Sequence, residues 1–328
     1  MSGVRELASN KKSPSAGRAE RPSARTLLEL DRFSSASLKA WQALSADLDQ
    51  LEQTLYFALE PERRRLMPQL LAALQGKACK PMAINGWVRM VSYTYSRQPL
   101  SAAGSLLAYG GRFNAGAELD PGAPSPWPCL YIAQDFETAF RERFQLSSGD
   151  SVGGLKPEEL ALKPNSSLVS VQVHGRLQQV FDMTKPQCFD ELAGVLSKVK
   201  MPDRAKALQK KLQIPASQLF MMRKGAQFWE AAVKQNWRVQ PVQFGLPSQS
   251  QLLAALIRRA GYEAIFYPSS KAPGRCVAVF PEQLQAGSFV ALQDKPPYDD
   301  TVTVLDAGTA DALAGWEILP AQQQPHQR

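Results

Sequence analysis

Cysteine and histidine are scarce in this chain, and they are not clustered. The 328 residues include four cysteines without a CxxC pair and two histidines, His174 and His326. A zinc site needs several soft ligands gathered together. We therefore expect no metal, and we expect reduced, mostly packed cysteines in a cytoplasmic protein.

Long apolar runs are also missing. No run of about 18 apolar residues is present, so we expect no membrane partner. Residues 1–26 are polar, rich in Ser, Arg and Lys, and lack the apolar centre of a secretory signal. Export by the general secretory route is not expected. Delivery into a target cell by a route without such a signal remains open.

Positive charge exceeds negative charge, but it is not concentrated. Of the formal charge of +8, half lies in residues 1–26, which contain six basic and two acidic residues. The remainder is spread along the chain without a dense basic run. Nucleic-acid binding is therefore not expected to be the main role.

The N-terminal third divides into a tail and a helical segment. Residues 1–26 have few large apolar side chains and predict a disordered basic tail. From residue 35, leucines recur at three- and four-residue steps, which is typical of an amphipathic helix. Pro61 is expected to begin a second helix and Pro68 to kink or split it. Residues 27–80 thus predict a helical hairpin, which serves either as packing or as a docking module.

Short strands and helices alternate irregularly in the rest of the chain, which favours an α+β fold. Residues 84–290 are expected to form the main domain, and residues 291–328 a C-terminal tail. Expected strands cover residues 86–91, 129–133, 167–173, 179–183, 264–267 and 276–280, and the clearest expected helices cover residues 135–144 and 249–260.

Three separate motifs carry polar residues suited to chemistry. Residues 110–114 read GGRFN and residues 130–133 read LYIA, with Glu142 eleven positions after Tyr131. Far downstream, residues 267–269 read YPS. Each motif alone is common, but their order is more informative.

In order and wording, these motifs resemble the RES-domain family, named for its Arg, Glu and Ser. The resemblance extends from about Trp87 to Pro281. It implies a fold similar to ADP-ribosyltransferases, with small antiparallel sheets and flanking helices around a cleft that holds NAD. It also implies cleavage of the nicotinamide–ribose bond, in some members with phosphate as acceptor. Several members are toxins that an Xre-type antitoxin holds inactive. The loop between Arg112 and Tyr131 is longer than in compact members.

The residue types suit this reaction. Glu142 is the candidate for stabilising the positive charge that develops on the ribose as nicotinamide leaves. The alternative is a surface glutamate paired with Arg141 or Arg143. Arg112 is expected to bind the pyrophosphate or a ribose-linked oxygen through paired hydrogen bonds, with Gly111 allowing close approach of the ligand.

The remaining candidates are expected either near the same ligand or in structural roles: a buried strand tyrosine for Tyr131 and a turn-stabilising serine for Ser269. Tyr131 is expected to lie against nicotinamide or ribose, and Ser269 to bind the amide, the ribose hydroxyls or the acceptor. Arg89 lines the cleft or lies on the surface, and Asn114 orients the ligand or completes the turn. The catalytic set is thus Arg112, Tyr131, Glu142 and Ser269.

The sequence therefore predicts an NAD-consuming toxin, with NAD as substrate and phosphate as the expected co-substrate. The partner would be an Xre-type antitoxin or an immunity protein. A mono-ADP-ribosyltransferase or an NAD glycohydrolase is the alternative of the same class. A non-catalytic binding protein built on a RES scaffold is the alternative of another class. The oligomeric state does not follow from the sequence.

Overall fold

A computed structural model describes residues 35–75, 81–120, 124–146 and 168–315. The predicted disordered tail, residues 1–26, and the final residues 316–328 lie outside these ranges. The chain divides into two compact units, Met1–Ala46 and Asp47–Arg328. No helix in the described ranges is long and apolar enough to cross a bilayer.

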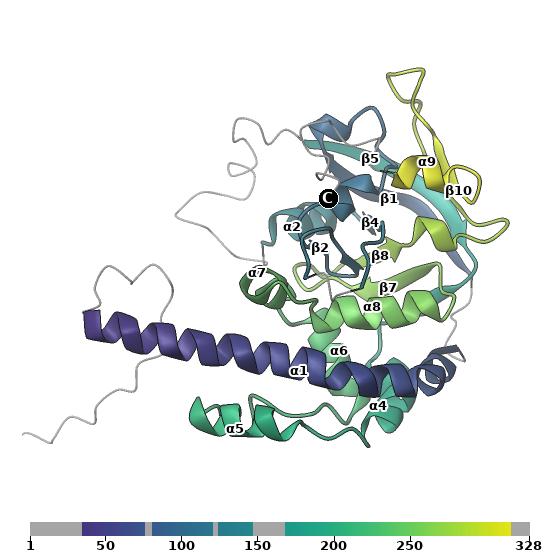
Figure 1. The fold of residues 1–328 in the computed structure, drawn as a ribbon. Helices are drawn as coiled ribbons and strands as arrows, with labels where there is room; N and C mark the ends of the chain where they lie inside the picture. The colour runs from purple at the N-terminus through teal and green to yellow at the C-terminus, as the bar shows by residue number, and fades with distance from the viewer. Residues whose placement is uncertain (1–34, 76–80, 121–123, 147–167, 316–328) are drawn as a thin grey trace, which may run out of the picture. The chain divides into compact units, whose positions relative to one another are not determined.

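The elements follow one another irregularly along the chain (Figure 1). The strands are β1 (Met82–Ser92), β2 (Gly110–Gly111), β3 (Asn114–Ala115), β4 (Leu130–Ala133), β5 (Leu168–Leu177), β6 (Val180–Asp182), β7 (Ala264–Pro268), β8 (Arg275–Val279), β9 (Phe289–Leu292) and β10 (Val304–Asp306). The helices are α1 (Ser35–Gln75), α2 (Phe136–Phe144), α4 (Asp190–Leu196), α5 (Asp203–Lys211), α6 (Gly225–Val233), α7 (Val239–Phe244), α8 (Gln249–Arg259) and α9 (Ala310–Ala314). Short 3-10 helices are η2 (Tyr93–Tyr95), η3 (Ala103–Leu106), η4 (Pro186–Phe189) and η5 (Pro281–Gln283).

Eight strands form one sheet in the order β10-β9-β5-β1-β4-β8-β7-β6, and β2 pairs with β3 in a separate ribbon. The α+β class is therefore confirmed, but the predicted small antiparallel sheets are replaced by a large sheet. Its one parallel pair among the described strands is β6 with β7. Helices α4 to α8 lie between these two strands in the chain, which supplies the long connection that parallel pairing requires.

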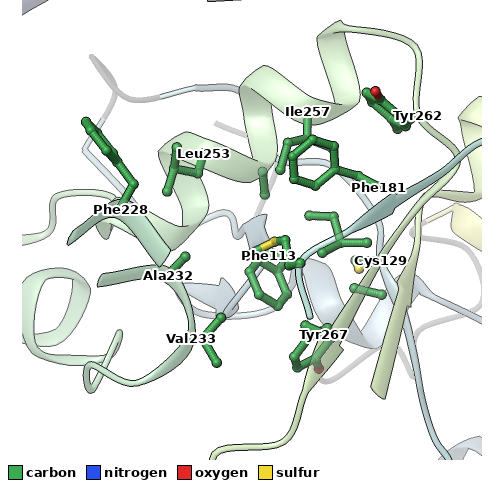
Figure 2. Packing of buried hydrophobic residues seen from close by; sticks show 14 of the residues in the cluster. Phe113, Cys129, Phe181, Phe228, Ala232, Val233, Leu253, Ile257, Tyr262 and Tyr267 are labelled. Atoms are coloured by element: carbon green, nitrogen blue, oxygen red, sulfur yellow. The ribbon is translucent and has the colours of Figure 1, made fainter. Parts of the chain in front are cut away.

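Both faces of the sheet are buried, which explains why its central strands are apolar. In β8, Cys276 and Ala278 belong to one hydrophobic cluster, the first cluster, and Val277 and Val279 belong to another, the second cluster. The first cluster also contains residues of α1, α6 and α8, and Figure 2 shows Phe113 in its middle. The β2–β3 turn is thus anchored in the core by an aromatic side chain.

The predicted helical hairpin is instead one continuous helix, α1, with Pro61 and Pro68 inside it. A proline inside a helix costs about 3 kcal/mol because it removes a hydrogen bond and crowds the preceding turn. Leu66, Leu70 and Leu74 are buried in the first cluster, and this packing offsets the cost. Arg63 also donates from Nη2 to the carbonyl of Tyr56 at 2.7 Å, one turn before Pro61.

The C-terminal segment predicted as a tail takes part in the sheet. β10 pairs with β9 at the sheet edge, and Leu305, Ala310 and Leu313 belong to the second hydrophobic cluster. A strand is predicted from alternating apolar and polar residues, and β10, with three residues, is too short to show this pattern clearly.

The clearest predicted elements are confirmed with small shifts at their ends. Asp135 caps α2 by accepting a hydrogen bond from the backbone of Thr138 at 2.7 Å. Helix α8 begins with a capping box between Ser248 and Gln251 and stops before Gly261, whose φ is +94°.

The side chain of Glu263 holds two loops at the edge of the sheet in place. Its side chain is fully buried and accepts from the backbone N–H groups of Gln178 (2.7 Å), Gln179 (2.9 Å) and Gln285 (2.6 Å). Two of these bonds reach Oε2 and the third reaches Oε1. One carboxylate therefore joins the β5–β6 turn to the segment before β9.

We predict that Glu263→Gln destabilises the fold by about 2 kcal/mol, because the amide must point its N–H₂ group at a backbone donor. Urea unfolding of the variant and the parent measures the change. Exposed Glu118 provides the matched control, since Glu118→Gln should leave the unfolding midpoint in place. Equal midpoints for both variants would contradict this role for Glu263.

Candidate active site

A cavity of about 480 Å³ lies beside the sheet. Its wall is formed by β1, β4, the β2–β3 ribbon, α2 and residues just before α7. Five of the residues named from the sequence line it: Arg89, Gly111, Arg112, Tyr131 and Glu142. Ser269 and Asn114 are not among its lining residues. The cavity therefore gathers candidates from separate segments between positions 89 and 142.

Arg112 stands in the turn between β2 and β3, with its side chain 8% exposed. Nη1 donates to the backbone carbonyls of Ala232 and Gln235, both at 3.1 Å. Nη2 lies 3.3 Å from Oγ of Ser270. The C-terminal end of α6 therefore aims this guanidinium at the cavity wall.

Glu142 is held in place by the loop after β7. Its Oε1 accepts from Oγ of Ser269 at 2.6 Å and from the backbone N–H of Ser270 at 3.1 Å. Arg141 pairs instead with Glu137. Because Ser270 contacts both Glu142 and Arg112, the acidic and basic candidates meet at one loop.

The Ser269 hydroxyl contacts the Glu142 carboxylate, and Ser269 is not among the residues that line the cavity. Its Oγ donates to Glu142 and accepts from the backbone N–H groups of Lys271 (3.0 Å) and Ala272 (3.1 Å). These bonds fix the serine hydroxyl in one direction. Ser269 is therefore arranged to orient Glu142.

Tyr131 supports the turn that carries Arg112. Its hydroxyl accepts from the backbone N–H of Phe113 and donates to Oδ1 of Asn114, each at 2.9 Å. Burial raises the pKa of Tyr131 well above its usual value, so the hydroxyl stays protonated at neutral pH. The ring lines the cavity while the hydroxyl holds the turn.

Asn114 is fully buried beneath the same turn. Its Oδ1 also accepts from the backbone N–H of Gly111 at 2.9 Å, and its Nδ2 donates to the carbonyl of Ser105 at 2.7 Å. A Cβ on Gly111 would lie 2.5 Å from the Tyr131 hydroxyl and 2.7 Å from Asn114 Oδ1. Only glycine fits at this position.

Gln251 of α8 is a positioning residue that the sequence analysis missed. Its buried Nε2 donates to the carbonyls of Tyr109 (2.8 Å), Gly111 (3.0 Å) and Asn114 (2.9 Å). Its Oε1 accepts from the backbone N–H of Ser248 at 2.9 Å. The capping pattern of α8 was the only signal in the sequence, and it gave no hint of the contact with β2 and β3.

Arg89 is buried in β1 and holds backbone in place. It donates from Nε to Pro99 O (2.6 Å), from Nη2 to Ser101 O (2.6 Å) and from Nη1 to Tyr131 O (3.1 Å). Burial lowers the pKa of Arg89 to about 10, so the side chain stays cationic at neutral pH.

Two further arginines and two further aromatic residues also line the cavity. Arg143, Trp237, Arg238 and Tyr267 all face it, and the sequence analysis did not select them. The guanidinium of Arg238 stacks on the ring of Trp237 at 5.0 Å and has no hydrogen-bond partner among the described residues. Burial lowers the pKa of Arg238, and the nearby charges of Arg112 and Arg143 lower it further while Glu142 raises it. Within the described ranges, four arginines and one carboxylate therefore line this cavity.

Two buried cysteines, Cys129 and Cys276, also line the cavity. Burial raises the pKa of both thiols far above the usual value, so neither is a thiolate nucleophile at neutral pH. In the described ranges, no group of three or more His, Cys, Asp or Glu side chains is placed to hold a metal ion.

Comparison with known proteins identifies a family. The model of the RES domain matches residues 87–301, which include every candidate site residue from Arg89 to Ser269. No curated protein gives a significant match. Among solved structures, the chain is similar to one in the crystal structure of the M. tuberculosis MbcT–MbcA toxin–antitoxin complex. That match has 12% sequence identity and a TM-score of 0.37, and covers 75% of this chain and 97% of the other.

We predict that Gly111→Ala destabilises the protein by about 2 kcal/mol, because the methyl group must displace Tyr131 and Asn114 and break their hydrogen bonds. Thermal unfolding measures the loss. Gly194→Ala in α4 is the control, since nothing lies within 4 Å of its added Cβ. This control should be neutral or slightly stabilising. The packing argument fails if the two variants unfold at the same temperature.

Proposed function

This chain belongs to the RES-domain family, and we propose that it is an enzyme that cleaves the nicotinamide–ribose bond of NAD, with inorganic phosphate as the acceptor. The observation that carries the proposal is the held carboxylate of Glu142, which lines a cavity together with Arg112. A cavity of about 480 Å³ lies within the usual size range of small-molecule sites.

In this reaction the bond between ribose C1″ and the nicotinamide nitrogen breaks, and its electron pair neutralises the cationic ring. Positive charge then develops on the ribose, as in glycoside cleavage. A carboxylate fixed by two hydrogen bonds before the substrate arrives stabilises that charge without reorganising. Glu142 is therefore the residue to which we assign transition-state stabilisation, with Ser269 orienting it.

The arginines suit the anionic parts of the reactants. Arg112, Arg143 and Arg238 line the cavity, and Arg238 lies close enough to the other two to feel their positive charge. We assign the pyrophosphate of NAD to Arg112 and the acceptor phosphate to Arg238, whose guanidinium makes no hydrogen bond to a described residue. Tyr131 and Trp237 supply flat apolar surface for the nicotinamide and ribose.

We favour phosphate over water as the acceptor because an attacking water molecule must lose a proton. A phosphate dianion attacks C1″ with an oxygen that carries no proton, so no general base is required. Burial raises the pKa values of Tyr131 and Tyr267, and neither hydroxyl is a base at neutral pH. Attack by water would require Glu142 to serve as the base in addition to its charge-stabilising role.

The biological role follows from the resemblance to the family. Phosphorolysis of NAD in the cytoplasm depletes the cell of its cofactor, which makes the enzyme a toxin. We propose an Xre-type antitoxin or an immunity protein as its partner. We also propose that the fold is similar to that of ADP-ribosyltransferases. A mono-ADP-ribosyltransferase would share the cleavage step and differ in the acceptor.

Purified protein incubated with NAD should release nicotinamide and, in the presence of phosphate, form ADP-ribose-1″-phosphate, which mass spectrometry detects. Glu142→Gln should lower the rate by about 100-fold, because the neutral amide does not offset the developing charge. Glu137→Gln, on the exposed side of the same helix, should keep activity. A folded protein that releases no nicotinamide with or without phosphate would rule out the enzyme.

Arg238→Gln should raise the KM for phosphate about tenfold while the KM for NAD changes little, because the acceptor loses a charge-assisted hydrogen bond. Initial rates at varied phosphate with saturating NAD measure this effect. Arg97→Gln is the control, since Arg97 pairs with Asp300 and does not line the cavity. An unchanged KM for phosphate would remove Arg238 from the acceptor site.

A further inference from the structure

A second cavity, of about 570 Å³, lies apart from the first and shares no lining residue with it. It is bordered by the loop after α4, by the first turns of α5 and by the segment that leads into α6. Among the described residues, its lining contains four cationic side chains and no carboxylate: Lys200, Lys206, Arg223 and Lys224. We call this feature the basic groove.

Few carboxylates offset this charge locally. Lys206 pairs with Asp203 at 2.8 Å, and Arg223 donates to the backbone carbonyl of Ser197. Lys200 and Lys224 are exposed and have no side-chain ion pair among the described residues. The groove therefore presents positive charge that is available to a partner. Ion pairs across such an exposed rim steer binding and set its specificity.

Apolar side chains lie between the cations. Phe220 is 46% exposed, and Met201 and Met221 line the same cavity. Covering the exposed part of an aromatic ring with a partner's apolar side chain is favourable. Methionine side chains adapt to differently shaped apolar groups and are frequent at binding surfaces. The groove thus combines a soft apolar site with a positive rim.

We propose that the basic groove binds an acidic segment of a partner protein. One apolar or aromatic side chain of that segment packs against Phe220, and neighbouring carboxylates pair with Lys200 and Lys224. The complementary charge guides the encounter, and the buried apolar anchor supplies most of the affinity. This inference does not depend on the proposed NAD chemistry.

The shape and composition of the groove favour a peptide over a nucleic acid. Single-stranded nucleic acid needs a long positive track with several aromatic platforms for successive bases. Here four cations line one cavity, and Phe220 is the only aromatic residue in its lining within the described part of the chain. A small free anion would also bind poorly, because the lysine and arginine side chains that face it remain hydrated.

Helix α6 connects the groove to the first cavity. Gln227 in the first turn of α6 lines the groove, whereas Ala232 near its end accepts a hydrogen bond from Arg112. A partner seated in the groove therefore contacts the helix that holds Arg112.

Fluorescence anisotropy with the full chain tests the proposal. The probe is a fluorescein-labelled peptide in which glutamates flank a central tryptophan, and it should bind saturably and more weakly as salt rises. A peptide with glycine in place of the tryptophan should bind at least tenfold more weakly. The double variant Lys200→Glu, Lys224→Glu should raise the Kd at least tenfold, and Phe220→Ala should also weaken binding.

The matched control is the double variant Lys198→Glu, Lys210→Glu, which reverses two exposed lysines outside the groove lining and should keep the parent affinity. Thermal unfolding of each variant confirms that it is folded. Three results would overturn the proposal: no saturable peptide binding, equal loss in both double variants, or competition by a single-stranded oligonucleotide that binds more tightly than the peptide.

Discussion

The turn that carries Arg112 depends on a buried set of polar contacts. Asn114 and Tyr131 support it from below, and Gln251 of α8 binds three of its carbonyls. Phe113 anchors the same turn in the hydrophobic core. A short two-stranded ribbon has little stability of its own, so groups from α8 and β4 hold the turn in place, and the end of α6 directs the Arg112 side chain. Because these polar atoms are buried, losing one partner leaves another unsatisfied at high cost.

The same design principle applies to the acidic side of the cavity. Glu142 is fixed by Ser269 and Ser270. Ser270 lies against both charged groups, so the loop after β7 couples the carboxylate to the guanidinium. Such a site keeps its charges in place before a ligand binds, and this is the main way in which protein electrostatics accelerates a reaction. Cavity chemistry and fold stability therefore share the same loops.

Sequence reasoning found the charged residues more readily than their supports. Arg112 and Glu142 stand in short motifs, and the motif order was enough to select them. Ser269 was expected to contact the ligand and Asn114 either to orient it or to complete the turn, and the structure places both outside the cavity lining. Gln251 and Arg238 stand in unremarkable segments, and their relevance depends on which distant segments meet. The predicted hairpin failed because two prolines were weighed by their local cost, without the packing of Leu66, Leu70 and Leu74.

The sequence by itself determined the α+β class, the bounds of helices such as α2 and α8, the polar motifs and the family, because caps, periodicity and short motifs are local properties. Only the tertiary structure decided that eight strands form one sheet and that α1 is continuous. It also decided that four cations gather in the basic groove although the chain has no dense basic run. These features depend on pairing and packing between residues far apart in the chain. The free energy of such long-range contacts cannot be inferred from any single local segment.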